Sequence, residues 1–410
     1  MKQTFHDLVG SKCQGPLSSE YLQNLAYTLA NKREHFPHRA FMVARSDGAG
    51  VVSPGKRIAG SRPSLVMVFT EQGAQWPRMG RELLLRSDLC FQSTIRSLDK
   101  HLRDAQAPSL PQWTLEEELL KPPRTSGVQT AELSQPLCTA VQIGLVNMFM
   151  AAGVEPQAVV GHSSGEIASA YAAGALTEKE AVIVAWQRGL VVKKQTKPGA
   201  MAAIGLGLDE VRDLLTANVT VACENSNKSI TLSGDAPEVN DTILRIQKTH
   251  PEALTRLLKV DKAYHSHHMS EIGEEYSAVL QRNFIGRKPV KPFFSSVTGK
   301  IETIPLDGPY WQKNLESRVL FRTAVLQVLA LIENPIFLEL GPHSALAGPL
   351  RQISAEVSSS TPYVSTMSRG EDCTETFLSA VGKLFELNVP IDFSTIATGG
   401  HCLSDLPPYP

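Results

Sequence analysis

The feature that most constrains the fold is the segment 161–165, which reads Gly-His-Ser-Ser-Gly. An apolar run at 158–160 precedes it, and a helix-forming run at 166–173 follows it. Gly-x-Ser-x-Gly between a strand and a helix predicts a nucleophile elbow, because the glycines permit a tight turn that exposes the serine hydroxyl. The following helix would direct the positive end of its dipole at the same point. Ser163 is therefore a candidate nucleophile in an α/β fold, and the alternative is a glycine-rich turn with an inert serine.

Composition excludes several classes of protein. The 410 residues suffice for two or three domains, and 42% hydrophobic with 20% charged residues is ordinary globular usage. A formal net charge of −1 gives no electrostatic reason to expect nucleic acid or a membrane surface as partner. The six cysteines form no CxxC pair, and neither a membrane-length apolar run nor a signal-peptide core at residues 1–7 is present. We expect a soluble cytoplasmic protein with reduced thiols.

The order of elements predicts a sheet that is mainly parallel. Strands are expected at 65–70, 158–160, 293–297 and 336–340, and helices at 136–152 and 178–194, with Pro136 in the first turn of its helix. Alternation of strands and helices is typical of α/β architecture. Before this body, residues up to about 61 form a separate unit with a helical stripe at 22–29 and a strand at 40–45. A connector rich in Gly, Ser and Pro follows at 46–63.

A segment with a different pattern is inserted into this body. Strands are expected at 200–207, 219–224, 229–233 and 257–260, and helices at 208–215 and 238–248. The order βαββαβ is that of the ferredoxin-like split motif. Two lobes arranged in this way leave a cleft between them, which is a usual place for a substrate.

Arg188 lies on a mostly apolar helix, where its neighbours three and four positions away are valines and alanine. A buried guanidinium requires an anion. Two interpretations remain open on the residues alone: a structural salt bridge, or a clamp for a substrate carboxylate, whose geometry the planar guanidinium matches.

A general base is expected in the segment 261–269, which contains His265, His267 and His268. A metal site is disfavoured, because no carboxylate or cysteine lies at ligand spacing and adjacent histidines diverge. Spacing alone does not say which histidine is the base. His162 and His343 are interpreted as packing or turn residues.

Ordered motifs place the chain beside a known family. They are FTEQGAQW at 69–76, GHSSG at 161–165, QR at 187–188, AYHS at 263–266 and LGPH at 340–343. Together they resemble the malonyl-CoA:acyl-carrier-protein acyltransferases, and more narrowly the acyltransferase domain of fungal highly reducing polyketide synthases. The resemblance implies an α/β-hydrolase-like large subdomain (63–198 and 266–352) with an inserted ferredoxin-like small subdomain (199–265). Residues 1–62 resemble the linker that follows a ketosynthase, and 353–410 the linker after the acyltransferase, as in a piece of a longer polypeptide.

The resemblance also implies a mechanism. Ser163 would attack malonyl-CoA with His265 as general base, and the N–H groups of Gln72 and Ser164 would form the oxyanion hole. The main-chain carbonyl of Asn314 would orient His265 in place of a triad acid. The phosphopantetheine thiol of an acyl carrier protein would then take the malonyl group in a ping-pong cycle. No metal and no permanently bound cofactor are implied.

Substrate choice is assigned to three further positions. Arg188 would hold the malonyl carboxylate, and His162 is placed among the substrate-binding residues. Tyr264 would crowd an α-methyl group, worth roughly 1–3 kcal/mol, which favours malonyl over methylmalonyl; the alternative is that Tyr264 simply packs on the sheet.

One residue departs from the family pattern: Glu71 stands where a glycine is usual. We expect its side chain to point to solvent and activity to persist. Two other functions compete with the acyltransferase: an α/β-hydrolase-type esterase or thioesterase, and a catalytically silent docking domain.

Overall fold

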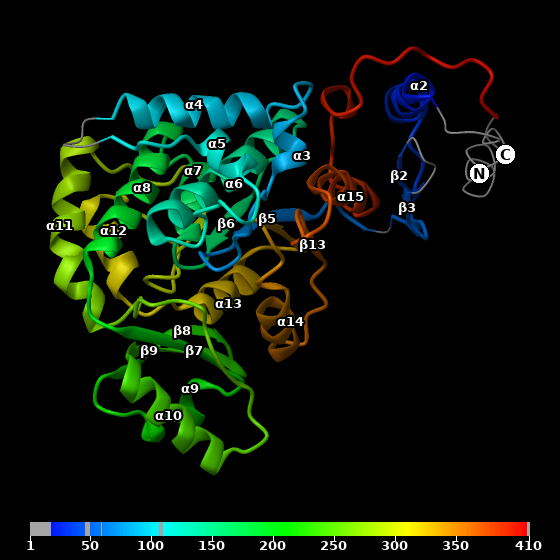
Figure 1. The fold of residues 1–410 in the computed structure, drawn as a ribbon. Coiled ribbons are helices and arrows are strands. Elements are labelled where there is room, and N and C mark those ends of the chain that lie inside the picture. Colours follow the sequence, from blue (N-terminus) through cyan, green and yellow to red (C-terminus); the bar gives the residue numbers. More distant parts are fainter. Residues whose placement is uncertain (1–17, 46–49, 59, 106–109, 408–410) are drawn as a thin grey trace.

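The computed structural model describes residues 18–45, 50–58, 60–105 and 110–407. The N-terminal segment 1–7 discussed above, part of the connector 46–63 and the last three residues lie outside these ranges. A large body carries a smaller lobe at its lower edge in Figure 1, and α2 lies beside the C-terminal part of the described chain at its side. No helix in the described ranges has both the length and the apolarity needed to cross a bilayer.

The large body is built on five parallel strands in the order β11-β6-β5-β12-β13. Their bounds are Phe293–Phe294, Ala158–Gly161, Ser64–Phe69, Pro335–Leu340 and Tyr363–Ser365. The central strands are buried almost throughout, which explains their continuous apolar sequences. The predicted parallel α/β sheet is confirmed. β11 is shorter than expected because a turn begins at Ser295, whose carbonyl accepts from Gly299 N at 2.9 Å.

Helices cover this sheet: α3 (Arg81–Leu84), α4 (Phe91–Arg103), α5 (Leu115–Leu120), α6 (Ala131–Ala151), α7 (Gly165–Ala172), α8 (Glu178–Lys194), α11 (His267–Asn283), α12 (Gly308–Glu316), α13 (Phe321–Leu331) and α14 (Ala347–Glu356). α8 has the bounds expected from the sequence and begins at a capping box between Thr177 and Glu180. The predicted start of α6 was wrong. The helix begins at Ala131, so Pro136 lies inside it and removes one backbone donor from the helical ladder.

The small lobe is an antiparallel sheet in the order β10-β7-β9-β8, with its own apolar core. Its elements follow one another as β7 (Gly199–Ile204), α9 (Leu208–Val211), the 3-10 turn η1 (Arg212–Leu214), β8 (Val219–Ser226), β9 (Ser229–Asp235), α10 (Ala236–Thr249) and β10 (Thr255–Leu257). The expected order βαββαβ is therefore observed. β8 joins the lobe to the large body, because Val319 bonds Ala222 O at 2.8 Å and accepts from Glu224 N at 2.9 Å.

The N-terminal segment packs against the C-terminal one. α2 (Ser19–Asn31) shares a small apolar cluster with Leu406, and α15 (Cys373–Glu386) contacts β2 (Met42–Ala44). β2 pairs with β3 (Gly50–Val52), β1 (His38–Arg39) pairs with β4 (Lys56–Arg57), and the 3-10 turn η2 (Phe393–Thr395) lies beside α2. Figure 1 shows the two segments side by side, away from the small lobe.

Candidate active site

Ser163 occupies the predicted strand–turn–helix, between the end of β6 and the start of α7. Its φ of 51° lies in the left-handed region, which a side chain seldom adopts. The glycines on either side are required by space. A Cβ at Gly161 would lie 2.4 Å from Glu166 N, and one at Gly165 would lie 2.4 Å from Phe69 O. The backbone is thus closed tightly around the turn, and the serine is held at its tip.

His265 is the histidine of its segment that reaches this serine. Its Nε2 lies 2.6 Å from Ser163 Oγ, and both side chains are buried. Nδ1 donates to the carbonyl of Ser317 at 2.8 Å, which leaves Nε2 as the acceptor for the serine hydroxyl. Burial, and then the positive charge of Arg188, lower the pKa of His265 to about 3. The imidazole is therefore neutral at physiological pH and able to take a proton.

The carbonyl that orients His265 was assigned to the wrong residue. Ser317, not Asn314, supplies it, because α12 ends at Glu316 and the extended backbone of Ser317 (ψ 158°) turns its carbonyl out of the helix. Asn314 lies one turn earlier and acts through its side chain. Its Nδ2 donates to Ser163 O at 3.0 Å and to Glu166 Oε2 at 2.9 Å.

Arg188 lies fully buried on α8 and is linked to the backbone of Ser163 through Asn314. Its Nη1 donates to Asn314 Oδ1 at 2.8 Å, while Nε has no hydrogen-bond partner among the described residues. Within the described residues Arg188 forms no ion pair with a carboxylate, which argues against a structural salt bridge. Burial lowers the pKa of Arg188, but a guanidinium stays charged in proteins. A buried cation with only neutral partners can still accommodate an anion.

Gln72 follows β5 and lies against the elbow. Its backbone N–H donates to Ser164 Oγ at 3.0 Å, which places this donor beside the elbow, and its role in an oxyanion hole stays a prediction. Its side-chain Nε2 donates to Tyr264 OH at 3.0 Å, and its Oε1 accepts from Gln135. The sequence reasoning missed Gln135, although an amide buried in the apolar helix α6 is a usable signal.

A pocket of about 580 Å³ opens beside His265, between β8 and the segment that follows α12. Its lining includes Thr220, Ser266, Glu316, Ser317 and Arg318. The pocket lies at the junction of the two lobes and reaches His265, while Ser163 is not part of its lining.

Comparison with known proteins agrees with this geometry. The sequence profile described as "Acyl transferase domain" matches residues 66–389. The chain belongs to the acyl transferase family. It is 51% identical over 411 residues to the highly reducing polyketide synthase sphB of Aspergillus fumigatus, covering 98% of this chain and 16% of that protein. It is 46% identical over 395 residues to gloL of Glarea lozoyensis, also a highly reducing polyketide synthase, covering 95% of this chain and 15% of that protein.

Solved structures of acyl transferase domains have the same fold. The acyltransferase domain from module 8 of the salinomycin polyketide synthase matches with a TM-score of 0.81 and 25% identity, covering 96% of this chain and 94% of that one. A loading acyltransferase from the avermectin synthase matches with a TM-score of 0.71 and 31% identity, covering 78% of this chain and 100% of that one. Because the chain spans only about one sixth of the two fungal synthases, their activities as whole proteins are not transferred to it.

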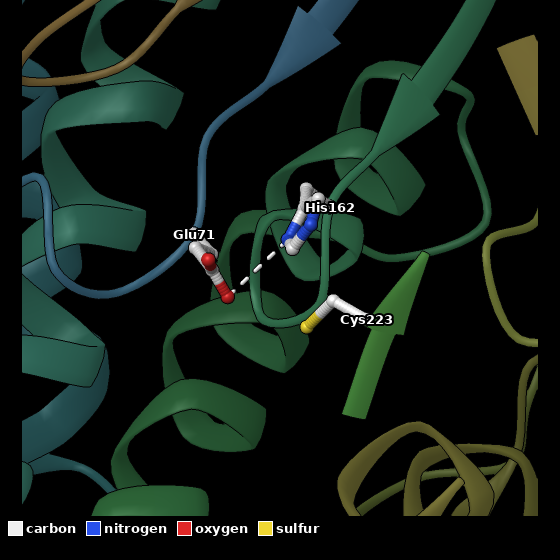
Figure 2. Close-up of side chains that lie close together, drawn as sticks. All are labelled: Glu71, His162 and Cys223. Carbon is white, nitrogen blue, oxygen red and sulfur yellow. Dashed lines mark ion pairs between the residues drawn. The ribbon is translucent and has the colours of Figure 1, made fainter. Parts of the chain in front are cut away.

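The prediction that Glu71 points to solvent was wrong for this acyl transferase domain. Figure 2 shows its carboxylate turned toward His162, with Oε2 of Glu71 3.2 Å from Nδ1 of the imidazole. The side chain of Glu71 is 36% exposed, whereas that of His162 is 1% exposed. Burial alone would lower the pKa of His162, but Glu71 and Asn225 outweigh it and raise that pKa. The raised pKa favours the protonated imidazole, and the positive charge of that form attracts the carboxylate.

The two other histidine assignments have different outcomes. His162 bonds Asn225 Oδ1 through Nε2 at 2.7 Å and packs on Phe321, which matches the packing role and leaves its substrate-binding role a prediction. His343 lies in the turn after β12, as expected, and its Nδ1 accepts from Arg369 N at 3.3 Å.

The expectation that no carboxylate accompanies His267 and His268 was also wrong. Folding brings Asp235, at the end of β9, to 2.6 Å from Nε2 of His268 and 3.3 Å from Nε2 of His267. A contact between a strand of the small lobe and the start of α11 is not visible in sequence spacing.

Glu166, in the first turn of α7, is a further buried group that the sequence reasoning missed. Its carboxylate accepts from Tyr310 OH at 2.7 Å, Ser296 Oγ at 3.0 Å and Asn314 Nδ2 at 2.9 Å. Burial raises the pKa of Glu166 to about 7, and these donated bonds oppose that rise. The residue anchors the helix that carries the elbow.

Proposed function

We propose that the chain transfers a malonyl unit from malonyl-CoA to the phosphopantetheine thiol of an acyl carrier protein. The observation that carries the proposal is Arg188, a fully buried guanidinium that has no carboxylate partner among the described residues. Asn314 links it to the backbone of Ser163, the serine that bonds a neutral histidine. An acyl group with a free carboxylate would complete the pairing of Arg188. An acyl group without one would leave the charge buried and unpaired, which is the basis of discrimination.

The reaction proceeds in two half-reactions through one ester. Ser163 Oγ attacks the thioester carbonyl while His265 Nε2 takes the hydroxyl proton, and the C–S bond breaks to release CoA with that proton. The carrier thiol then attacks the seryl ester, His265 relays its proton to Ser163, and the acyl chain leaves as a new thioester. Atoms and charge balance in each half.

Charge that develops on the carbonyl oxygen would be held by the N–H groups of Gln72 and Ser164. The Gln72 N–H bonds Ser164 Oγ in the free protein, so it must exchange that partner for the substrate oxygen. A donor of this kind contributes roughly 3 kcal/mol to catalysis. Ser317 keeps His265 in the tautomer that the first step requires.

Selection of malonyl over methylmalonyl is assigned to Tyr264. The ring is 7% exposed, and its hydroxyl is held by the Gln72 amide, so it has little freedom to move away from a bulkier substrate. A methyl-sized clash is worth roughly 1–3 kcal/mol.

The supporting architecture is proposed as an α/β-hydrolase-like subdomain (63–198 and 266–352) with a ferredoxin-like subdomain (199–265). Residues 1–62 and 353–410 are proposed as linkers to neighbouring domains of a polyketide synthase, with the ketosynthase on the N-terminal side. The partners are then malonyl-CoA, a carrier protein domain and those neighbours. An esterase would be expected to orient its histidine with an acid, whereas a backbone carbonyl does so here.

Intact mass measured after incubation with malonyl-CoA tests the proposal. We expect one malonyl adduct that passes to an added carrier protein and is absent from Ser163→Ala. Ser169→Ala is the matched control, because that serine is also buried in α7 but outside the site. Rapid hydrolysis without transfer would indicate an esterase, and the absence of any adduct would indicate a silent domain; either result would overturn the proposal.

A further inference from the structure

Three potential metal ligands meet beside the nucleophile. One ligand atom each of Glu71, His162 and Cys223 lies within 4.8 Å of the other two. Figure 2 shows that they come from separate segments: the loop after β5, the elbow, and strand β8 of the small lobe. The proposed acyl transfer uses none of these three side chains in a chemical step.

The hydrogen bonds of His162 leave one of its nitrogens facing this cluster. Nε2 bonds Asn225 Oδ1 at 2.7 Å, and the Asn225 amide is oriented by its own bond from Nδ2 to Thr231 Oγ1 at 3.2 Å. Because an amide oxygen only accepts, Nε2 carries the hydrogen, and in neutral His162 the lone pair is on Nδ1.

This Nδ1 is buried and poorly satisfied. Glu71 Oε2 lies 3.2 Å away, yet Nδ1 has no hydrogen bond of acceptable geometry within the described residues. A carboxylate and an imidazole lone pair that face each other repel unless a cation lies between them. Either a proton or a metal ion would remove this repulsion. The sulfur of Cys223 nearby favours a metal ion, because thiolate is a metal ligand.

We propose that Glu71, His162 and Cys223 form a binding site for a thiophilic divalent cation of the zinc class. Oxygen, nitrogen and sulfur are the donors that zinc takes in proteins. With zinc bonds of about 2.0–2.3 Å, the ligands of a tetrahedral site lie roughly 3.3–3.7 Å apart, so the 3.2 Å between Glu71 and His162 needs little adjustment.

The surroundings meet the other requirements of such a site. The bond from Nε2 to Asn225 fixes the imidazole, as the outer partners of metal-bound histidines do. The side chain of Glu71 is 36% exposed, so the cation would enter from its side, and water would be the fourth ligand. When the metal binds, the S–H bond of Cys223 breaks, an S–metal bond forms and the proton leaves to solvent.

A cation bound here would join the two lobes. Cys223 belongs to the small sheet, while Glu71 and His162 follow adjacent strands of the large sheet. Binding to the folded state alone raises its stability, and the gain grows with the logarithm of the free metal concentration above Kd. The site does not depend on the proposed acyl transfer, since it can be occupied without malonyl-CoA.

Titration of the metal-free 410-residue chain with Co²⁺ tests the site, because thiolate bound to cobalt gives a charge-transfer absorption that oxygen and nitrogen ligands do not. We expect this absorption to saturate at one Co²⁺ per chain and to be displaced by Zn²⁺. Zn²⁺ should also raise the melting temperature. Cys223→Ser should abolish the absorption, and Glu71→Gly should weaken Co²⁺ binding at least ~10-fold.

Two controls separate this site from other ligands. Cys138→Ser removes another buried thiol and should leave the titration unchanged. Asp235→Asn removes the carboxylate beside His267 and His268, and it should also have no effect on the absorption. Absorption that survives Cys223→Ser, or that Asp235→Asn abolishes, would overturn the proposal. So would the lack of any thiolate band. If Cys223→Ser does not fold, judged by circular dichroism, undiminished binding by Glu71→Gly decides against the site.

Discussion

Replacing Arg188 with methionine tests the central step of the proposed function. The change removes the guanidinium and both bonds that it would give a substrate carboxylate, while keeping a side chain of similar length in the apolar environment of α8. Within the described residues Arg188 meets the neutral groups of Asn314, whose Oδ1 lies 2.8 Å from Nη1, and of Tyr276, and it forms no ion pair with a carboxylate that would replace the substrate's contribution.

The magnitude follows from the geometry. Each hydrogen bond to a charged group contributes about 1.5–3 kcal/mol, so two of them contribute roughly 3–6 kcal/mol. At ~1.4 kcal/mol per factor of ten, kcat/KM for malonyl-CoA should fall by about 100-fold or more. Acetyl-CoA has no carboxylate, and its loading should stay constant or improve, because the variant no longer buries an unpaired charge.

The ratio of the rates with malonyl-CoA and acetyl-CoA cancels those effects of Arg188→Met that do not depend on the substrate carboxylate. The unpaired Asn314 oxygen and the loss of the positive charge near His265 affect both substrates equally. The assay is therefore the ratio of kcat/KM for malonyl-CoA and acetyl-CoA, measured by the rate at which Ser163 is acylated. Arg322→Met is the matched control, since Arg322 is partly exposed and paired with Glu356. An unchanged ratio in Arg188→Met would refute the reasoning.

Three further outcomes follow from the same structure. Gly161→Ala places a Cβ 2.4 Å from Glu166 N and should lower stability by about 1–3 kcal/mol and abolish acylation; an unchanged melting temperature would contradict the tight elbow. Tyr264→Ala should raise the ratio of methylmalonyl to malonyl loading roughly 10–100-fold, measured by competition between the two CoA esters, whereas an unaltered ratio would reduce Tyr264 to a packing residue. Burial raises the pKa of Glu339 from 4.5 to about 7. Between these values the folded state holds a proton that the unfolded state has released. The contribution of Glu339 to stability is therefore present below pH 4.5 and is lost as the pH rises through 7. Glu339→Gln should flatten the pH dependence of the unfolding free energy by up to roughly 3 kcal/mol over that interval, and an unaltered slope would show that Glu339 is not its source.

Local patterns account for most of what the sequence predicted. The elbow, the bounds of α8 and the order βαββαβ depend on apolar periodicity, caps and glycines within short windows. The start of α6 was misplaced because proline is favoured in the first turn of a helix. In the structure Pro136 lies inside the helix, which begins at Ala131.

Contacts between distant segments were not predictable from such windows. Ser317 orients His265 because α12 ends one residue before it, and the position of a helix end is uncertain by a residue or two in a sequence. Glu71 was assigned to solvent because its own segment contains no partner. Its partner, His162, comes from the adjacent strand of the sheet, and only the parallel pairing of β5 with β6 brings the two together.

Asn314 has a more direct connection to the chemistry than the role the resemblance gave it. Both hydrogens of its amide are used, on Ser163 O and on Glu166 Oε2, and its oxygen accepts from Arg188. The amide therefore cannot rotate without placing its NH₂ group against the guanidinium. It bonds the backbone carbonyl of Ser163, whose φ is left-handed, and it also fixes Nη1 of Arg188. A carboxylate at this position would neutralise Arg188 and remove the unpaired charge that malonate is proposed to meet. A neutral amide fixes the same geometry and leaves that charge for the malonyl carboxylate of the proposed reaction.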